Sequence, residues 1–166
     1  YDGTEEKPYR IACIEDLVEW TNHWGKYQSK YIVLERTLDF EDPESYNNYL
    51  AVVTTDINGN TKKEALMTEL TTGTGFKPIN TFSGTFDGQG HTIRAEVIGV
   101  NSDGEVDEDA TECNIFNVKE ACDVKIINMV IKGGKAAAIY NKGSLLLENI
   151  TVANAYNTQD DRGGGT

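Results

Sequence analysis

The sequence predicts a mainly β protein: a right-handed parallel β-helix of about three coils behind an N-terminal capping α-helix. Three observations lead to this fold class. A six-residue pattern recurs along the chain, strand-like segments dominate after its first quarter, and one amphipathic helix precedes them. The period of the pattern, about 21 residues around a short β-prone core, is typical of one coil of a solenoid.

The repeat is marked by asparagine. Residues 126–131 and 147–152 both read apolar, any, Asn, apolar, any, apolar, and they lie one period apart. Apolar positions at steps zero, three and five cannot all face inward on a straight strand. A bend at the Asn resolves this, because Asn tolerates turn dihedrals and bonds nearby backbone. We therefore expect Asn128 to stack on Asn149. The alternative is two unrelated strands that share a common residue.

A weaker copy of the pattern lies at 93–98, which is more than one period before 126–131. We assign the surplus in the spacing to the acidic loop 101–112. Stacking of the three copies predicts the solenoid core. Its members are Ile93, Ile98, Ile115, Phe116, Ile126, Met129, Ile131, Leu147, Ile150 and Val152.

The segments before the repeat follow the usual sequence signals. Apolar spacing predicts a helix over 11–24 that ends before Gly25, and its apolar face is Ile14, Leu17, Val18, Thr21 and Trp24. Residues 30–40 alternate as a strand, with Ile32, Leu34, Leu38 and Phe40 on one side. A polar stretch with a brief strand at 51–55 follows, and a capping box from Thr61 to Glu64 opens a short helix that ends near Leu70.

These signals divide one β-helix domain over 1–166 into five parts. We expect a leading segment with the capping helix, the first strands, an irregular insertion, the solenoid coils and a tail, at 1–28, 29–40, 41–75, 76–157 and 158–166. The tail ends in Gly163, Gly164, Gly165 and Thr166, which we interpret as an interruption of a longer solenoid.

Composition excludes several classes of function. The chain has 27 acidic and 15 basic residues and a net charge of −12, which disfavours nucleic acid and anionic membrane surfaces. No apolar stretch is long enough for membrane insertion in this segment. The three cysteines, Cys13, Cys113 and Cys122, lack metal-ligand spacing and allow at most one disulfide, so we expect buried free thiols.

Two acidic turns are weak calcium candidates, and we expect no other cofactor. The first contains Asp56, Asn58 and Asn60, and the second contains Asp103, Glu105 and Asp107. Both present oxygen ligands at alternate positions, but neither has the full spacing of a calcium loop. A solvated polar turn is the simpler interpretation of each.

Residues 82–93 read F-x-G-x-F-D-G-x-G-H-T-I, and this run resembles the segment that opens GLUG-type β-helix repeats of bacterial surface proteins. Those repeats are in turn similar to filamentous-haemagglutinin-like helices. Residues 8–24, 30–40 and 75–79 resemble the family in the expected order. Two departures are Asn114-Ile115-Phe116-Asn117, in place of Gly-Leu-Phe-Gly, and Glu96 at a position that is usually apolar.

The resemblance implies a secreted or cell-surface bacterial setting but no activity. We expect a non-catalytic, adhesin-like module or stalk that binds a glycan or a host or cell-surface protein, with Tyr46, Tyr49 and Tyr156 as candidate sugar contacts. The alternative is a carbohydrate-active enzyme domain of the lyase or hydrolase type. Asp87 and His91 are four apart, but we expect Asp87 to bond the backbone of a glycine-rich turn rather than to act as an acid.

Overall fold

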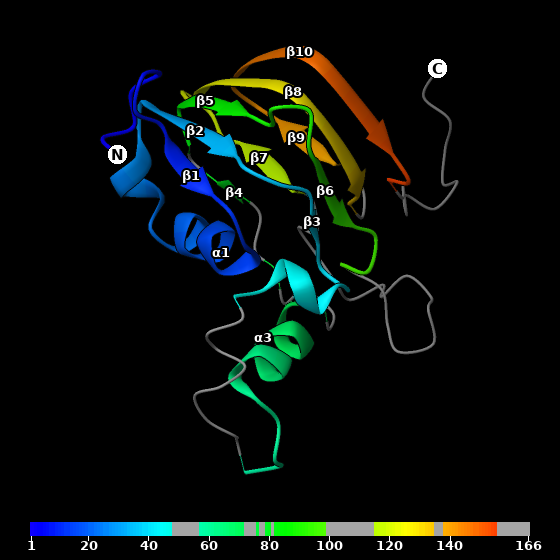
Figure 1. Cartoon of the computed structure of the whole chain (residues 1–166). Helices are drawn as coiled ribbons and strands as arrows, with labels where there is room; N and C mark the ends of the chain where they lie inside the picture. Colours follow the sequence, from blue (N-terminus) through cyan, green and yellow to red (C-terminus); the bar gives the residue numbers. More distant parts are fainter. Residues whose placement is uncertain are drawn as a thin grey trace, which may run out of the picture.

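The structure, a computed structural model, describes residues 1–47, 57–71, 76, 79–80, 82–98, 115–134 and 138–155 (Figure 1). The brief strand expected at 51–55, Asn114, Cys113 and the expected tail lie outside these ranges. Cys13 and Cys122 are free thiols; Cys122 is buried as expected, whereas Cys13 is only partly buried. Partial burial raises the pKa of the Cys13 thiol to about 12.

Strands in two sheets form most of the regular secondary structure of the described residues, which confirms a mainly β protein. The larger sheet contains β1 (Tyr9–Ile11), β2 (Lys30–Leu34), β3 (Leu38–Asp39), β5 (Gly84–Asp87), β6 (Thr92–Ala95), β8 (Asp123–Gly133) and β10 (Ser144–Ala153). The smaller sheet contains β4 (Ile79–Asn80), β7 (Phe116–Val118) and β9 (Ile139–Asn141). Every pairing between described strands is parallel.

The chain visits the two sheets in the same order three times. It passes from β4 to β5 and β6, then from β7 to β8, and then from β9 to β10. The long β8 pairs with β5 through its first half and with β6 through its second half. Figure 1 shows β5, β8 and β10 as successive curved layers. Each pass therefore adds one layer to both sheets.

The two Asn-marked hexads stack one above the other, as the sequence predicts. Ile126 pairs with Leu147 and Met129 pairs with Ile150, so β8 and β10 are offset by one period of the sequence pattern. Both asparagines have positive φ, +54° at Asn128 and +55° at Asn149. This conformation reverses the inward parity, so that Ile126, Met129 and Ile131 are all buried.

The predicted register of the third copy is wrong. Ile93 pairs with Ile131 rather than with Ile126, whose partner is Phe86. The register differs because the chain in this layer changes direction through the turn 88–91, which is longer than the single Asn used in the other two layers. The apolar residue before the corner is therefore Phe86, and β6 after the corner contributes Ile93.

The N-terminal helix begins later than expected. Ile11 is the last residue of β1, and α1 spans Ile14–Asn22. The Asp16 carboxylate accepts a hydrogen bond from the Ala12 backbone N–H at 2.9 Å. This bond holds the first turn of the helix against the residue that precedes it. After α1 the chain continues as the 3₁₀ helix η1 (Trp24–Tyr27).

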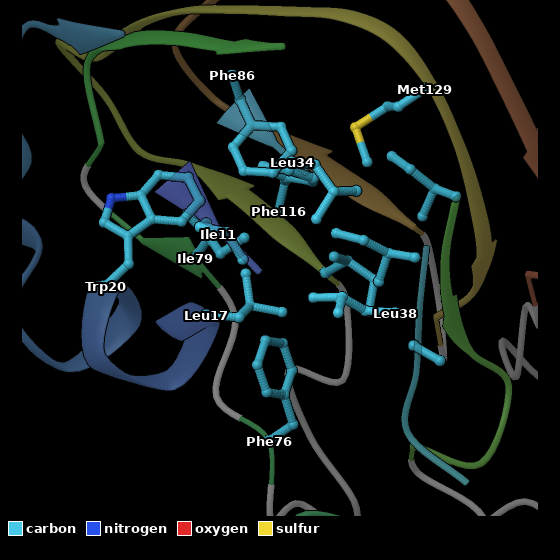
Figure 2. Close-up of a cluster of buried hydrophobic side chains, with 14 of the residues drawn as sticks. Ile11, Leu17, Trp20, Leu34, Leu38, Phe76, Ile79, Phe86, Phe116 and Met129 are labelled. Atoms are coloured by element: carbon cyan, nitrogen blue, oxygen red, sulfur yellow. The ribbon is translucent and has the colours of Figure 1, made fainter. Parts of the chain in front are cut away.

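The buried face of α1 is Ile14, Leu17 and Trp20, and this corrects the expected face ending at Trp24. Because the helix stops at Asn22, Trp24 lies in η1, and Trp20 faces the sheets instead. Its ring stacks on Phe86 with centroids 5.2 Å apart and meets Phe82 edge to face at 4.8 Å. Figure 2 shows Leu17 and Trp20 on α1 facing Phe86 and Phe116 of the sheets.

Most of the predicted core is confirmed. Ile32, Leu34, Leu38 and Phe40 are all nearly inaccessible, as are Ile93, Ile98, Ile115, Phe116, Ile126, Met129 and Ile131. Leu147 and Val152 are exceptions, at 45% and 46% exposed, and Ile150 is only partly buried. These three side chains belong to β10, over which no described strand lies.

The segment between β3 and β4 contains two helices in its described part. The short 3₁₀ helix η2 spans Pro43–Ser45, and α3 spans Lys62–Thr71. The predicted capping box is confirmed: the Thr61 N–H donates to the Glu64 carboxylate at 2.7 Å, and the Glu64 N–H donates to the Thr61 hydroxyl at 3.1 Å. Among the described residues, no helix has the length and apolar character that crossing a bilayer requires.

The structure shows where two residues that depart from the family pattern, Asn117 and Glu96, lie. Asn117 is not in a turn, because it belongs to β7 and is 4% exposed, so no left-handed dihedral is needed there. Glu96 follows the end of β6 and accepts a hydrogen bond from the Asn154 side chain at 3.3 Å. Its carboxylate therefore takes part in a polar contact.

Candidate functional site

Polar side chains line one corner of the stack, where the chain in each layer bends between two strand segments of the larger sheet. The corner residues are Asp87 at the end of β5, Asn128 within β8 and Asn149 within β10. The Asn149 side-chain Nδ2 donates to Asn128 Oδ1 at 3.1 Å, and the Asn128 side-chain Nδ2 donates to Asp87 Oδ1 at 3.2 Å. These bonds link three successive layers through side chains, and we name the set the corner ladder.

Asp87 anchors the corner ladder through further hydrogen bonds. Its Oδ1 also accepts from the Gln89 backbone N–H at 2.9 Å, and its Oδ2 accepts from the Tyr31 hydroxyl at 3.1 Å. Burial, and secondarily the Asp87 charge, raises the pKa of Tyr31 to about 12. The tyrosine therefore remains a donor at neutral pH, and the carboxylate has partners on both oxygens.

The turn after Asp87 packs closely against the next layer. A Cβ on Gly88 would lie 2.1 Å from the Met129 Cβ and 2.7 Å from the backbone carbonyl oxygen of Asn128. The Gly88 N–H donates to the Ile127 carbonyl at 2.8 Å. A residue with a side chain could not approach β8 in this way, which explains the glycine at this point of the motif.

Removing the ladder amide should destabilise the fold. We expect Asn128→Ala to lower the free energy of unfolding by about 2–4 kcal/mol, because it loses two hydrogen bonds and forces alanine into a left-handed conformation. Asn128→Gly should cost less, since glycine adopts the positive φ without strain. Urea titrations of both variants separate the two contributions. A glycine variant as stable as the parent chain would show that the ladder contributes nothing.

The expected role of Asp87 is confirmed, because its carboxylate caps the 88–91 turn through the Gln89 N–H. His91 also belongs to that turn: its N–H donates to the Gly88 carbonyl, and its carbonyl accepts from the Val130 N–H. These contacts give the glycine-rich part of the 82–93 motif a structural role, which is to form the corner of its layer.

A hollow of about 90 Å³ lies where α1, η1 and the first two strands meet. Aromatic rings, carboxylates and a guanidinium share its wall. The lining residues are Tyr9, Arg10, Ile11, Asp16, Glu19, Trp20, Tyr27 and Ile32. Tyr9 and Tyr27 meet edge to face, with ring centroids 5.3 Å apart. The volume holds several water molecules, and so could take one edge of a sugar ring.

Several polar groups of the hollow already have partners. Arg10 is paired with Glu35, Asp16 accepts from the Ala12 N–H, and Glu19 pairs with Lys26 at 3.5 Å. The Trp20 Nε1–H is different: it is buried and has no hydrogen-bond partner among the described residues. Such groups are rare in folded proteins because an unpaired buried donor costs free energy.

Sequence reasoning did not find this hollow. Its residues come from β1, α1, η1 and β2, and no spacing pattern connects them. The single signal was a high local density of aromatic residues near the start of the chain, with Tyr9, Trp20 and Tyr27 close together.

Most of the calcium candidates lie outside the part of the chain that the structure describes. Asp56, Asp103, Glu105 and Asp107 lie outside the described ranges. Asn58 and Asn60 are exposed in the turn that precedes α3. No group of three or more His, Cys, Asp or Glu residues with metal-binding geometry occurs within the described part of the chain.

The candidate sugar contact at Tyr46 is wrong. This side chain is 2% exposed and belongs to the core, where its hydroxyl donates to the Phe40 carbonyl at 2.9 Å. Burial, and secondarily the charges of Glu15 and Asp39, raises its pKa well above the usual range. Tyr49 and Tyr156 lie outside the described residues.

Comparison with protein-family models, with curated proteins and with solved structures finds no match for this chain. The class of protein is therefore defined by the fold itself. It is a mainly β protein made of stacked parallel strands, with a polar ladder at one corner and an aromatic hollow beside its N-terminal helix.

Proposed function

We propose that the chain is a non-catalytic extracellular or cell-surface module of a bacterium, built as a right-handed parallel β-helix with α1 as its cap. The observation that carries the proposal is the repeated strand order, in which each pass through both sheets adds one layer in parallel register. Right-handed crossovers dominate parallel connections generally. The resemblance of residues 82–93 to GLUG-type and filamentous-haemagglutinin-like repeats points the same way.

A stack of this kind suits a stalk or a binding platform. Each layer contacts only its neighbours, so the fold extends in one direction and presents a rigid lateral surface. The net charge of −12 favours solubility and disfavours binding to nucleic acid. A cap such as α1 covers strand edges that would otherwise pair with other chains.

The hollow beside α1 is the best candidate for the binding function of the platform, and its wall favours a glycan. Aromatic rings offer apolar faces to the C–H groups of a sugar, while the carboxylates and Arg10 can bond hydroxyl groups. The small volume fits one edge of a terminal sugar ring.

The proposal is tested by combining a glycan array with an assay for released reducing ends. We expect saturable binding to a subset of glycans and no release of reducing ends from any of them. Release that rises with protein concentration would instead establish the carbohydrate-active enzyme, and an array without binders would contradict the glycan platform.

A substitution in the hollow connects the binding to its site. We expect Tyr27→Ala to weaken the best array glycan at least tenfold in isothermal titration calorimetry, because it removes half of the Tyr9–Tyr27 ring pair. Tyr140→Ala is the matched control, since Tyr140 is 48% exposed on β9 and does not line the hollow. Equal losses for both variants would place the glycan elsewhere.

A further inference from the structure

The hollow beside α1 carries one negative charge that no described cation neutralises. The charged side chains on its wall are Arg10, Asp16 and Glu19. Two of them, Arg10 and Glu19, already have ionic partners, which are Glu35, Lys26 and His23. Asp16 forms no salt bridge with a described residue. The wall therefore favours a cation over an anion.

The charges of both wall carboxylates reach Tyr27, which also lines the hollow. Burial raises the pKa of the Tyr27 hydroxyl, Lys26 opposes the rise, and the charges of Glu19 and Asp16 add to it. The hydroxyl therefore stays neutral and adds no charge to the wall. The rings of Tyr9 and Tyr27 add negative potential above their faces, as aromatic π-systems do.

A side chain of the protein already shows which charge these groups attract. The Lys26 ammonium lies 5.7 Å from the centroid of the Tyr27 ring and 3.5 Å from Glu19. An ammonium group over an aromatic face, beside a carboxylate, is a common mode of cation recognition. Tyr9 and Asp16 offer the same combination within the hollow, and no described cation lies on either of them.

We propose that the hollow selects a sugar that carries a free ammonium group, with Asp16 as the counter-ion and the tyrosine rings beside it. This inference rests on the proposed glycan-binding function and names the class of glycan, an amino sugar whose nitrogen is not acetylated. The hollow of about 90 Å³ takes one edge of a ring, and the edge that carries the ammonium group would enter it. Acetylation would remove the charge and add bulk to that edge, and a uronic acid would bring a like charge to Asp16.

The test is an NMR titration of the isotope-labelled intact chain with the methyl glycosides of glucosamine, N-acetylglucosamine, glucose and glucuronic acid. We expect the glucosamine glycoside, in its ammonium form, to shift the backbone signals of Tyr9 and Tyr27 saturably. It should bind at least tenfold more tightly than the acetylated and neutral glycosides, and the glucuronic acid glycoside should not bind. Equal or tighter binding of a neutral or acidic glycoside would overturn the inference and leave the glycan platform in place.

Ethylammonium, an ammonium group without a sugar, separates this inference from the proposed function. If ethylammonium shifts the signals of Tyr9 and Tyr27 while no glycoside does, the ammonium site is supported and glycan recognition is contradicted. If neither ethylammonium nor any glycoside shifts them, both are contradicted.

Asp16→Asn removes the proposed counter-ion but keeps a side-chain oxygen that can accept from the Ala12 N–H. We expect this variant to bind the glucosamine glycoside at least tenfold more weakly and the glucose glycoside as the parent chain does. Glu148→Gln is the matched control, because it changes the net charge equally at a side chain that is 65% exposed on β10 and does not line the hollow. Equal losses in the two variants would assign the effect to net charge alone and overturn the site.

Lys26→Gln should have an effect of the opposite sign. It frees Glu19 and the Tyr27 ring for the ligand and removes a like charge beside the hollow. We expect the affinity for the glucosamine glycoside to rise at least threefold. A merely structural role of Lys26 predicts no gain, and a loss of affinity would show that the hollow prefers an anion.

Discussion

Replacing Ile126 by aspartate is expected to abolish the cooperative unfolding transition of this chain. The side chain is 0% exposed and lies in the middle of the stack, where it pairs with Phe86 of β5 and Leu147 of β10. A carboxylate there would be buried without a partner. We expect a loss of more than about 4 kcal/mol, a large part of the stability of a domain of this size.

The control for this variant is Lys132→Ala, on the opposite parity of the same strand. Lys132 is only partly buried and makes no described salt bridge, so its truncation should change the midpoint of urea unfolding very little. Unfolding is followed by circular dichroism and tryptophan fluorescence. An Ile126→Asp protein that melts like the parent chain would refute the assignment of the core.

Among small substitutions in the second half of β8, which pairs with β6, Gly133→Ala is expected to destabilise the fold most. Gly133 has φ of +95°, and a Cβ there would lie 2.5 Å from the Ala95 carbonyl carbon and oxygen. Both atoms are backbone, so they cannot move aside as a flexible side chain would. Strain and overlap together should lower the free energy of unfolding by about 2–5 kcal/mol.

Gly25→Ala is the matched control because a Cβ on Gly25 would meet no atom within 4 Å. This glycine lies in η1, and its substitution should change the free energy of unfolding by at most about 1 kcal/mol. Differential scanning calorimetry of the two variants gives the comparison. Similar melting temperatures would mean that β6 and β8 can move apart at Ala95 without lowering the free energy of unfolding.

The Asn-marked stack could be predicted from sequence because it depends on local rules that repeat. The apolar positions around Asn128 and Asn149 fit inward-facing side chains only if the strand bends at the Asn, and the positive φ of both residues confirms that bend. The capping box at Thr61 was predictable for a similar reason, since its hydrogen bonds join positions that are close in the chain.

The register of the first full layer could not be predicted in this way. Ile93 and Ile98 have the spacing of the repeat, yet Phe86 occupies the position before the corner. The turn 88–91 replaces a single residue, and only the backbone pairing shows which apolar residues lie on either side of it. Likewise, Tyr46 reads as a loop tyrosine but is buried, because the tertiary fold brings the segment after β3 against Phe40.

The sequence by itself determined the elements whose cause is local: the mainly β character, the amphipathic helix, the capping box and the bend at each Asn. Only the tertiary structure decided which layers meet, where the aromatic hollow forms, and which described strand has a neighbour on one side alone. The physical reason is that Leu147 and Ile126 satisfy the same local pattern, while burial depends on a neighbouring strand. That neighbour is present above β8 and absent, among the described residues, above β10.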